Sequence, residues 1–499
     1  MQTPEPSRAR DSAAVVFVRG HGDALEAYWV KRSDAVEFMP GFRAFVGGAV
    51  AREDEALEIE GVAAGPERVM RACAIREAFE ETGVLIGVVD PGPPERVAAA
   101  RERLLAGEVT FPELARDFGW QFRADGLEYC GRWVTPPFAY RRFDTWYFLA
   151  RVPQGQEPHI MFGELAEGEW VRPLQALERW QLGQETFAAP ILYNLIALAE
   201  GEQDLVPRMI AGPERAGSPR RIELKWGVVL HPAKTRPLPP ATHTNVYLVG
   251  EQEMAMIDPG CSDPEEQERL FALVELLAED RRRLKLVLLT HHHPDHIGAV
   301  EAVRARYQVL VAGHAETGKH VRLDFSLEDG EFVPLVPGVG DWNLQAVHTP
   351  GHTRGHLCFY HGRTRSLFTG DHVVGGGGTV VIDPPEGDMA DYVRSLERVI
   401  EMPVEVMFPG HGPPQGAAKR SFRWLLKHRQ GREAQVLAAL DAEPHTLAAL
   451  VERAYQDTAK ELWPYAERSL LAHLLKLEGE GRARREGEGW MVAANPDRR

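Results

Sequence analysis

Short apolar runs along the chain predict strands in both halves of the protein. In the N-terminal half these runs are residues 13–18 and 146–150, and in the C-terminal half residues 244–249 and 284–289. Runs of this length, bounded by turn-forming residues, are typical of strands in a sheet. Because helical patterns separate them, we expect a multidomain protein of α/β and α+β folds.

A helix with two distinct faces is predicted near residue 80. Glu77, Glu80 and Glu81 stand at positions i, i+3 and i+4, so three carboxylates share one face. The opposite face is apolar and consists of Ile75, Ala78 and Phe79. Gly83 is expected to end the helix. Since three like charges destabilise an isolated helix, Mg²⁺ or Mn²⁺ is expected to bind there.

Beyond residue 414 the pattern becomes helical. The predicted helices are residues 422–430, 434–442, 446–455 and 464–478, and a hairpin of residues 481–488 and 490–493 follows. The last three helices and the hairpin are typical of a winged helix. Several basic side chains here could meet phosphates of a nucleic acid, namely Arg468, Lys476, Arg482, Arg484 and Arg485. Packing on the preceding domain and homodimer contacts are the alternatives.

Composition narrows the class of protein. The chain has 499 residues, of which 44% are hydrophobic and 26% are charged, a length that predicts several domains. Its net charge of −16 argues against broad affinity for nucleic acid or anionic membranes, although a local basic patch stays possible. No signal peptide or membrane-spanning run is found, and the 4 cysteines lack paired spacing. We expect a cytoplasmic protein with reduced thiols and no membrane partner.

Histidines and aspartates of the C-terminal half come directly after predicted strands. His291, His293, Asp295 and His296 follow the run 284–289. Three further residues stand at later strand ends beside Gly or Pro, namely His352, Asp371 and His411. Strand ends place side chains at one edge of a sheet, where α/β sites form. This spacing indicates the ligands of a two-metal hydrolytic site.

These motifs resemble the metallo-β-lactamase superfamily over residues 222–415, which implies an αββα sandwich. The resemblance assigns one metal to three histidines, His291, His293 and His352. It assigns the other metal to Asp295, His296 and His411. Asp371 would bridge the two metals. Imidazole and carboxylate ligands suit two Zn²⁺ ions, with Fe or Mn left open by ligand type.

Other roles are expected for three further residues, Asp258, His292 and His372. By the same resemblance, Asp258 orients a ligand histidine from the second shell, and Asp295 is also a candidate catalytic residue. His292 and His372 adjoin ligands but stand outside the pattern. His372 could donate to an oxyanion, and a structural role is the alternative for both histidines.

The glutamate helix belongs to a second motif. Residues 76–84 fit the core of the Nudix box, and the glycine turn at residues 45–50 resembles the turn that precedes the Nudix helix. The resemblance covers residues 10–205 and implies an α/β/α sandwich. In it Glu77, Glu80 and Glu81 bind metal, Glu80 and Glu81 are catalytic, and Arg76 pairs with a carboxylate.

The Nudix motif departs from its family in one respect, because the segment before Arg76 is longer than usual. Glu53 or Asp54 could take the first acidic position, with an insertion through residues 61–65. This insertion resembles the coenzyme A diphosphatase branch. A further acid is expected among three residues, Glu164, Glu167 and Glu169. A Pro- and Gly-rich segment, residues 213–221, would join this domain to the next.

The winged helix, predicted at residues 420–495, narrows the metallo-β-lactamase resemblance to the lactamase-β-like group, which includes single-strand endoribonucleases. We therefore interpret the chain as a metal-dependent hydrolase with two sites. The lactamase site would cleave an ester, a thioester or a phosphodiester, and the Nudix site a diphosphate of a nucleotide derivative or coenzyme A. Both sites could act on acyl-coenzyme A. Two alternatives are a ribonuclease that binds single-stranded RNA and a scaffold protein whose Nudix domain is inactive.

Overall fold

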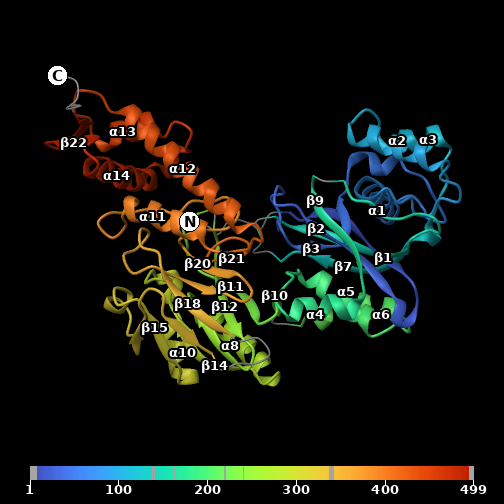
Figure 1. Cartoon of the computed structure of the whole chain (residues 1–499), viewed down its shortest axis with the longest axis horizontal. Coiled ribbons are helices and arrows are strands. Elements are labelled where there is room, and N and C mark those ends of the chain that lie inside the picture. The colour runs from blue at the N-terminus through green and yellow to red at the C-terminus, as the bar shows by residue number, and fades with distance from the viewer. Residues whose placement is uncertain are drawn as a thin grey trace. The chain divides into compact units, whose positions relative to one another are not determined.

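The computed structural model describes residues 8–136, 139, 141–161, 163–217, 221–239, 241–335 and 342–493 (Figure 1). Two compact units divide between Leu230 and His231. The segment 213–221 contains a short helix, α7 (Gly212–Arg215). Residues 218–220 of that segment lie outside the described residues.

A mixed sheet forms the centre of the N-terminal unit. Its main path runs in the order β3-β2-β1-β8-β7, while β4 pairs with β1 and β9 pairs with β2. The strands are β1 (Arg10–Arg19), β2 (Glu26–Arg32), β3 (Arg43–Ala44), β4 (Val46–Ala49), β7 (Glu128–Val134), β8 (Phe143–Arg151) and β9 (Leu165–Val171). A separate short pair joins β5 (Ile59–Glu60) to β6 (Phe122–Arg123).

Strand β1 shows why this unit has three layers. Val15 and Phe17 pack in the core that also contains Phe79 of α1 (Pro66–Thr82). The alternate residue Val16 packs in a second core with Leu195 of α5 (Ala189–Ala199). Successive side chains of a strand point to opposite faces, so β1 requires a helical layer on each side. The predicted α/β/α sandwich is confirmed.

The other helices of this unit join the same two layers. One core includes residues of α2 (Pro94–Leu105) and α3 (Phe111–Phe118). The other includes residues of α4 (Pro173–Gln181) and α6 (Leu205–Ile210). Figure 1 shows α1, α2 and α3 on one side of the sheet and α4, α5 and α6 on the other.

Two sheets face each other in the C-terminal unit. The first runs β11-β12-β13-β14-β15-β16 and the second β17-β18-β19-β20-β21. Tyr247 joins them, because its ring lies 5.3 Å from that of Phe368 and 5.5 Å from that of Phe408. Helices cover both sheets, including α8 (Pro264–Glu279), α10 (Val300–Tyr307) and α11 (Met389–Glu401). The predicted αββα sandwich is confirmed.

The strands of the two sheets are short. The first sheet contains β11 (Val228–Lys234), β12 (His243–Gly250), β13 (Glu253–Ile257), β14 (Arg283–Leu288), β15 (Leu310–Gly313) and β16 (Phe325–Ser326). The second contains β17 (Phe332–Pro334), β18 (Asn343–His348), β19 (Leu357–His361), β20 (Ser366–Gly370) and β21 (Val406–Pro409). The unit boundary falls within β11, whose first residues pair with β10 (Ile222–Lys225).

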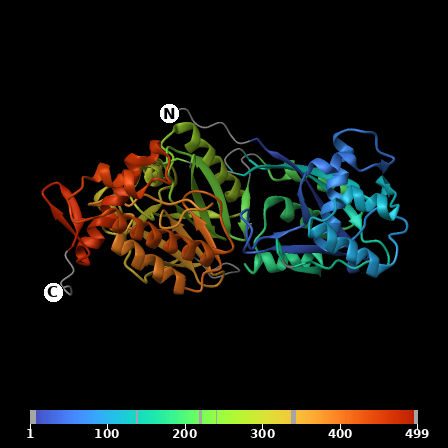
Figure 2. The same ribbon diagram turned by 90° about the horizontal axis from the view of Figure 1, so that it is seen from above.

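A winged helix follows and belongs to the same compact unit (Figure 2). It contains α13 (Leu447–Ala454), α14 (Trp463–Gly479), β22 (Ala483–Glu486) and β23 (Gly489–Val492). Its core includes Leu470, Leu474 and Leu477 of α14. The prediction of separate helices at residues 422–430 and 434–442 was wrong, because α12 (Ala418–Ala439) is continuous.

The reason for the continuous α12 is the stripe of buried side chains along it. Leu425 and Arg429 are buried before Gly431, and Arg432 and Val436 are buried after it. A glycine inside a helix costs about 1 kcal/mol relative to alanine. Burial on both sides of Gly431 offsets that cost. Among the described residues, no helix combines the length and apolarity that crossing a membrane requires.

Candidate metal centres

Five strands of the C-terminal unit end at one polar cluster. Asp258 follows β13, and the run 290–296 follows β14. The later ligand candidates stand after β18, β20 and β21 and are His352, Asp371 and His411. All of these strands belong to the two facing sheets. The strand ends therefore bring together side chains that are far apart in the sequence.

Three histidines make the first group of candidate ligand atoms. Nε2 of His291 lies 3.1 Å from Nδ1 of His293, and Nε2 of His352 lies 3.0 Å from the same Nδ1. All three ligand atoms lie within 4.8 Å of one another. Such an arrangement of three nitrogens fits one divalent ion.

The second group contains Asp295, His296 and His411, whose ligand atoms also lie within 4.8 Å of one another. Nε2 of His411 lies 3.2 Å from Oδ2 of Asp295 and 3.3 Å from Nε2 of His296. The group supplies two imidazole nitrogens and one carboxylate, a mixed set that suits Zn²⁺ and also iron or manganese.

Asp371 stands between the two groups. Its Oδ1 lies 3.5 Å from Nε2 of His296 and 3.3 Å from Nε2 of His411. Its Oδ2 lies 3.8 Å from Nε2 of His352 in the other group. Oδ1 is buried and has no hydrogen-bond partner. A buried carboxylate oxygen without a partner is costly, and cations on either side would compensate it.

The remaining ring nitrogens of two ligand histidines donate to backbone carbonyls. Nδ1 of His352 donates to the carbonyl of Val381 at 2.9 Å, and Nδ1 of His411 donates to the carbonyl of His243 at 2.9 Å. These bonds set the ring orientation and leave Nε2 as the ligand atom. The sequence did not indicate either acceptor, because any residue type has a carbonyl.

Asp258 is the acidic partner of His296. Its Oδ2 accepts from Nδ1 of His296 at 2.9 Å. The same carboxylate accepts from the backbone N–H of Thr290 at 2.8 Å and from Thr290 Oγ1 at 2.6 Å. These three bonds fit a residue that orients a ligand histidine, although an oxygen of Asp258 also lies within 4.8 Å of ligand atoms of His291 and His296.

Burial and charge set the protonation of the cluster. Burial lowers the pKa of His293 and of His352 to about 4, so both imidazoles are neutral ligands at pH 7. Burial also opposes charge on His411, yet Asp371 and Asp295 raise its pKa to about 10. Although burial opposes the ionised form of Asp371, His411 and His296 hold its pKa well below the usual range. The raised pKa values of His296 and His411 thus reflect the carboxylates around them.

Two glycines allow the chain to approach the ligands closely. A Cβ at Gly410 would lie 2.8 Å from Cε1 of His296 and 3.0 Å from Oδ1 of Asp371. A Cβ at Gly370, whose φ is +46°, would lie 2.5 Å from Oγ1 of Thr290. Side chains at these positions would displace the ligands.

The other histidines near the cluster are not grouped with the ligands. His292 stacks on His320 with ring centroids 3.8 Å apart. His372 is fully buried, and its ring lies 5.3 Å from that of Tyr392. Oxyanion donation by His372 stays a prediction, because His291 and His296 of the cluster are just as buried. His356, a lone histidine in the sequence, accepts from the backbone N–H of Asp371 at 3.2 Å.

The second candidate centre lies on α1 of the N-terminal unit. Arg76 is buried there and forms a bidentate pair with Asp54 at 2.7 and 3.0 Å. Nη1 of Arg76 also donates to Glu77 at 2.8 Å and to Glu80 at 3.0 Å. Asp54, rather than Glu53, therefore occupies the first acidic position of the motif.

The three glutamates of α1 are crowded and buried, and Arg76 contacts only Glu77 and Glu80 among them. Burial raises the pKa of Glu77 to about 7 and that of Glu81 to about 8. Burial also raises the pKa of Glu80. Glu81 accepts from the backbone N–H of Gly47 at 2.9 Å. A divalent cation beside this face would favour the ionised carboxylates, which is the compensation expected for the helix.

The three candidates for a further acidic residue of the Nudix site, Glu164, Glu167 and Glu169, have different neighbours. Glu167 and Glu169 pair with the buried Arg43 at 3.0 and 3.2 Å. Glu164 instead raises the pKa of Glu81 through charge repulsion, after the larger effects of burial and Glu77. Of the three candidates, Glu164 is therefore the one that acts electrostatically on the glutamate face.

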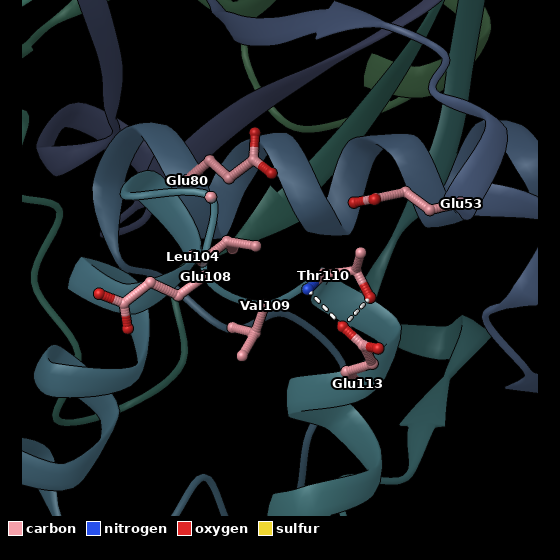
Figure 3. Close-up of a pocket in the computed structure, with 8 residues that line it drawn as sticks. Glu53, Glu80, Leu104, Glu108, Val109, Thr110 and Glu113 are labelled. Atoms are coloured by element: carbon pink, nitrogen blue, oxygen red, sulfur yellow. Dashed lines mark hydrogen bonds between the residues drawn. The ribbon is translucent and has the colours of Figure 1, made fainter.

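A pocket of about 370 Å³ opens beside Glu80. It is lined by Glu53, Glu80, Leu104, Gly107, Glu108, Val109, Thr110 and Glu113 (Figure 3). The carboxylate of Glu113 accepts from the N–H and the Oγ1 of Thr110, both at 2.8 Å. No arginine or lysine is among these described lining residues. A neutral, cationic or metal-bound group thus suits the pocket better than a bare phosphate.

Four of the five basic residues predicted to meet phosphates are paired with acids. Lys476 and Arg482 contact Glu433 at 2.7 and 3.0 Å. Arg484 contacts Glu486 at 2.8 Å, and Arg468 contacts Asp383 at 2.5 Å. Arg485 donates to the carbonyl of Gly487 at 3.2 Å. These contacts compensate the positive charges within the protein.

Comparisons with known proteins cover all three parts of the chain. A model of the metallo-beta-lactamase superfamily matches residues 239–411. A model of the beta-lactamase associated winged helix domain matches residues 446–490, and a model of the NUDT19 Nudix domain matches residues 59–198.

Two relatives and one solved structure are similar to parts of the chain. The Beta-lactamase-like protein 2 homolog of Drosophila melanogaster is 30% identical over 258 residues, which are 48% of this chain and 84% of that protein. The Atrochrysone carboxyl ACP thioesterase of Aspergillus fumigatus is 33% identical over 199 residues, 40% of this chain and 59% of that protein. A NUDIX hydrolase from Alicyclobacillus acidocaldarius is 27% identical, with a TM-score of 0.35, over 40% of this chain and 96% of that chain.

Proposed function

The chain belongs to the metallo-β-lactamase superfamily, and we propose that its lactamase site hydrolyses an acyl thioester with two Zn²⁺ ions. One observation carries the proposal: Asp371 stands between two groups of three ligand atoms, with one oxygen toward each group. Two divalent ions at such a site acidify a shared water and stabilise negative charge on a substrate oxygen.

The protein's own residues hold this centre in place. Hydrogen bonds from Nδ1 of His352 and His411 to carbonyl groups keep both Nε2 atoms directed at the cluster. Although burial opposes it, His296 lowers the pKa of Asp295, so this carboxylate is ionised and acts as a ligand rather than an acid. No separate nucleophilic side chain is required, because water attacks the carbonyl carbon.

The choice of a thioester rests on the leaving group and on one relative. The described residues of the cluster are ionised carboxylates and ligand imidazoles, which do not protonate a leaving group. A thiolate, whose thiol has a pKa of about 8.5, departs without protonation more readily than an alkoxide does. The similar protein from Aspergillus fumigatus, named as an acyl carrier protein thioesterase, supports the same class of substrate.

We propose a separate activity for the N-terminal unit, the Mg²⁺- or Mn²⁺-dependent hydrolysis of a diphosphate. Glu77, Glu80 and Glu81 would hold the metal that binds the substrate phosphates. Arg76 keeps two of these carboxylates in place, and Asp54 anchors Arg76. The acidic pocket beside Glu80 favours a nucleotide derivative with a neutral or cationic group over coenzyme A, whose 3′-phosphate would meet carboxylates.

One assay tests both activities. The purified protein is given acyl-coenzyme A, and free thiol and diphosphate cleavage are measured separately, with a dinucleotide diphosphate as a second substrate. We expect His352→Ala to abolish thiol release and to leave diphosphate cleavage intact, and Glu80→Gln to do the opposite. Absence of thiol release from acyl-coenzyme A and from acyl carrier protein thioesters would reject the thioesterase proposal.

A further inference from the structure

The segment of residues 380–383 connects the winged helix to a candidate metal ligand. The carbonyl of Val381 accepts from Nδ1 of His352 at 2.9 Å. Residues 380–383 form neither helix nor strand. Their position therefore depends on contacts with neighbouring elements rather than on a ladder of backbone hydrogen bonds.

Those contacts come from α12 and α14. Arg429 of α12 is buried and donates to the carbonyl of Val380 at 2.5 Å. Ser469 of α14 is also buried, and its Oγ accepts from the backbone N–H of Ile382 at 3.4 Å. Val380, Ile382 and Ala472 of α14 share one hydrophobic core. The segment is thus held on both sides of Val381.

Arg468 adds a third contact at the end of the same segment. Its Nε donates to Asp383 at 2.5 Å and its Nη2 donates to the carbonyl of Pro384 at 2.8 Å. Arg468 and Ser469 are successive residues of α14, which packs against α11 and α12 (Figure 1). In winged helices that read DNA, the corresponding helix enters a groove. Here these residues of α14 instead hold a loop of the neighbouring sandwich.

We propose that the winged helix is a positioning element of the lactamase site, in which Arg468 and Ser469 hold residues 380–383 so that Val381 orients His352. The inference rests on the proposed metal centre. The inference gives the winged helix a role in hydrolysis that requires no nucleic acid. Acceptors of this kind tune a metal through its ligand, and their loss lowers metal affinity by about 10- to 100-fold.

The test compares two arginines whose ion pairs are similarly exposed. Arg468 and Asp383 have side chains 45% and 54% exposed, and Arg453 and Asp441 of the same domain have side chains 46% and 51% exposed. Exposed ion pairs contribute little to folding stability. Arg453→Gln likewise removes an exposed ion pair and a bond to a backbone carbonyl, that of Ala439, but no contact with residues 383 and 384.

Zinc affinity is measured by competition with a chromogenic chelator, and thermal unfolding is recorded for each variant. We expect Arg468→Gln combined with Ser469→Ala to weaken zinc binding about 10-fold. Arg468→Lys should restore part of this loss, and Arg453→Gln should cause none. The melting temperature should change little. The proton signal of His352 Nδ1–H should shift in the double variant, which loss of stability alone would not produce.

Two outcomes separate this inference from the proposed function. If His352→Ala weakens zinc binding while the Arg468 and Ser469 double variant does not, the metal centre stands and the positioning role is rejected. If His352→Ala leaves zinc binding unchanged, the metal centre itself is rejected. A double variant that unfolds is replaced by Ser469→Ala alone, with the same readouts and the same criteria.

Discussion

Nδ1 of His296 donates to Oδ2 of Asp258 at 2.9 Å, and this bond directs Nε2 of His296 toward His411 and Asp371. The pair joins residues that follow two neighbouring parallel strands, β13 and β14. Because Asp258 also accepts two hydrogen bonds from Thr290, it ties the ligand to the backbone of the preceding strand end.

We predict that Asp258→Asn weakens zinc binding at the second group of ligands by about 10- to 100-fold. The amide keeps an acceptor for Thr290 but loses the charge that stabilises the orientation of His296. Chelator competition on the purified variant measures this change. Asp263→Asn is the control, because Asp263 caps α8 through similar backbone bonds and has no ligand contact. Equal zinc affinity in both variants would contradict the prediction.

We predict that Asp371→Asn lowers thioester hydrolysis by at least about 100-fold. The variant loses the carboxylate that faces both ligand groups, so bound zinc should fall from about two ions per chain to about one or fewer. Metal analysis and a free-thiol assay measure the two effects on one sample. Two retained ions with normal turnover would show that Asp371 does not bridge them.

The Nudix glutamates predict a pH dependence of Mg²⁺ binding. Burial raises the pKa of Glu77 to about 7 and of Glu81 to about 8, so both are largely protonated at pH 6 without metal. Mg²⁺ binds the ionised form and must displace these protons. Its affinity should rise as the pH increases from 6 through about 8, the pKa of Glu81, and level off only about one pH unit higher. Calorimetry in two buffers of different ionisation enthalpy would detect the proton release, and none at pH 7 would refute this prediction.

We predict that Arg76→Met destabilises the N-terminal unit by about 3–5 kcal/mol, because it leaves the buried Asp54 without its partner. Denaturant unfolding, followed by tryptophan fluorescence, measures the change. The matched control is Arg19→Met, which breaks partly exposed pairs with Glu26 and Glu157 and should cost under about 1 kcal/mol. Similar losses in both variants would show that Arg76 does not compensate a buried charge.

The sequence predicted those site residues whose side chains can bind a metal. Spacing after the strands identified His291, His352 and His411, because ligands need particular residue types at strand ends. It did not identify the partners of those ligands, since Val381 and His243 contribute only their carbonyls. A backbone acceptor is selected by tertiary structure, so no pattern in one sequence indicates it.

Two further differences between the predictions and the structure also arise from tertiary packing. Glu53 and Asp54 are adjacent acids in the sequence. Only the three-dimensional structure shows that Asp54 pairs with Arg76 while Glu53 lines a pocket. Residues 422–430 and 434–442 were predicted as two helices, but burial on both sides of Gly431 makes α12 continuous. Local patterns therefore predicted the elements and most chemical residues, whereas contacts over long distances set their roles.

The large sequence separation of the histidine contacts has a consequence for when the protein takes up metal during folding. The bond between His411 and the carbonyl of His243 spans 168 positions, and the pair His296 and His411 spans 115. Such distant partners meet late, after both sheets have closed on each other. Uptake of metal should consequently lag behind collapse of the nascent chain, and its rate would report the final closure step.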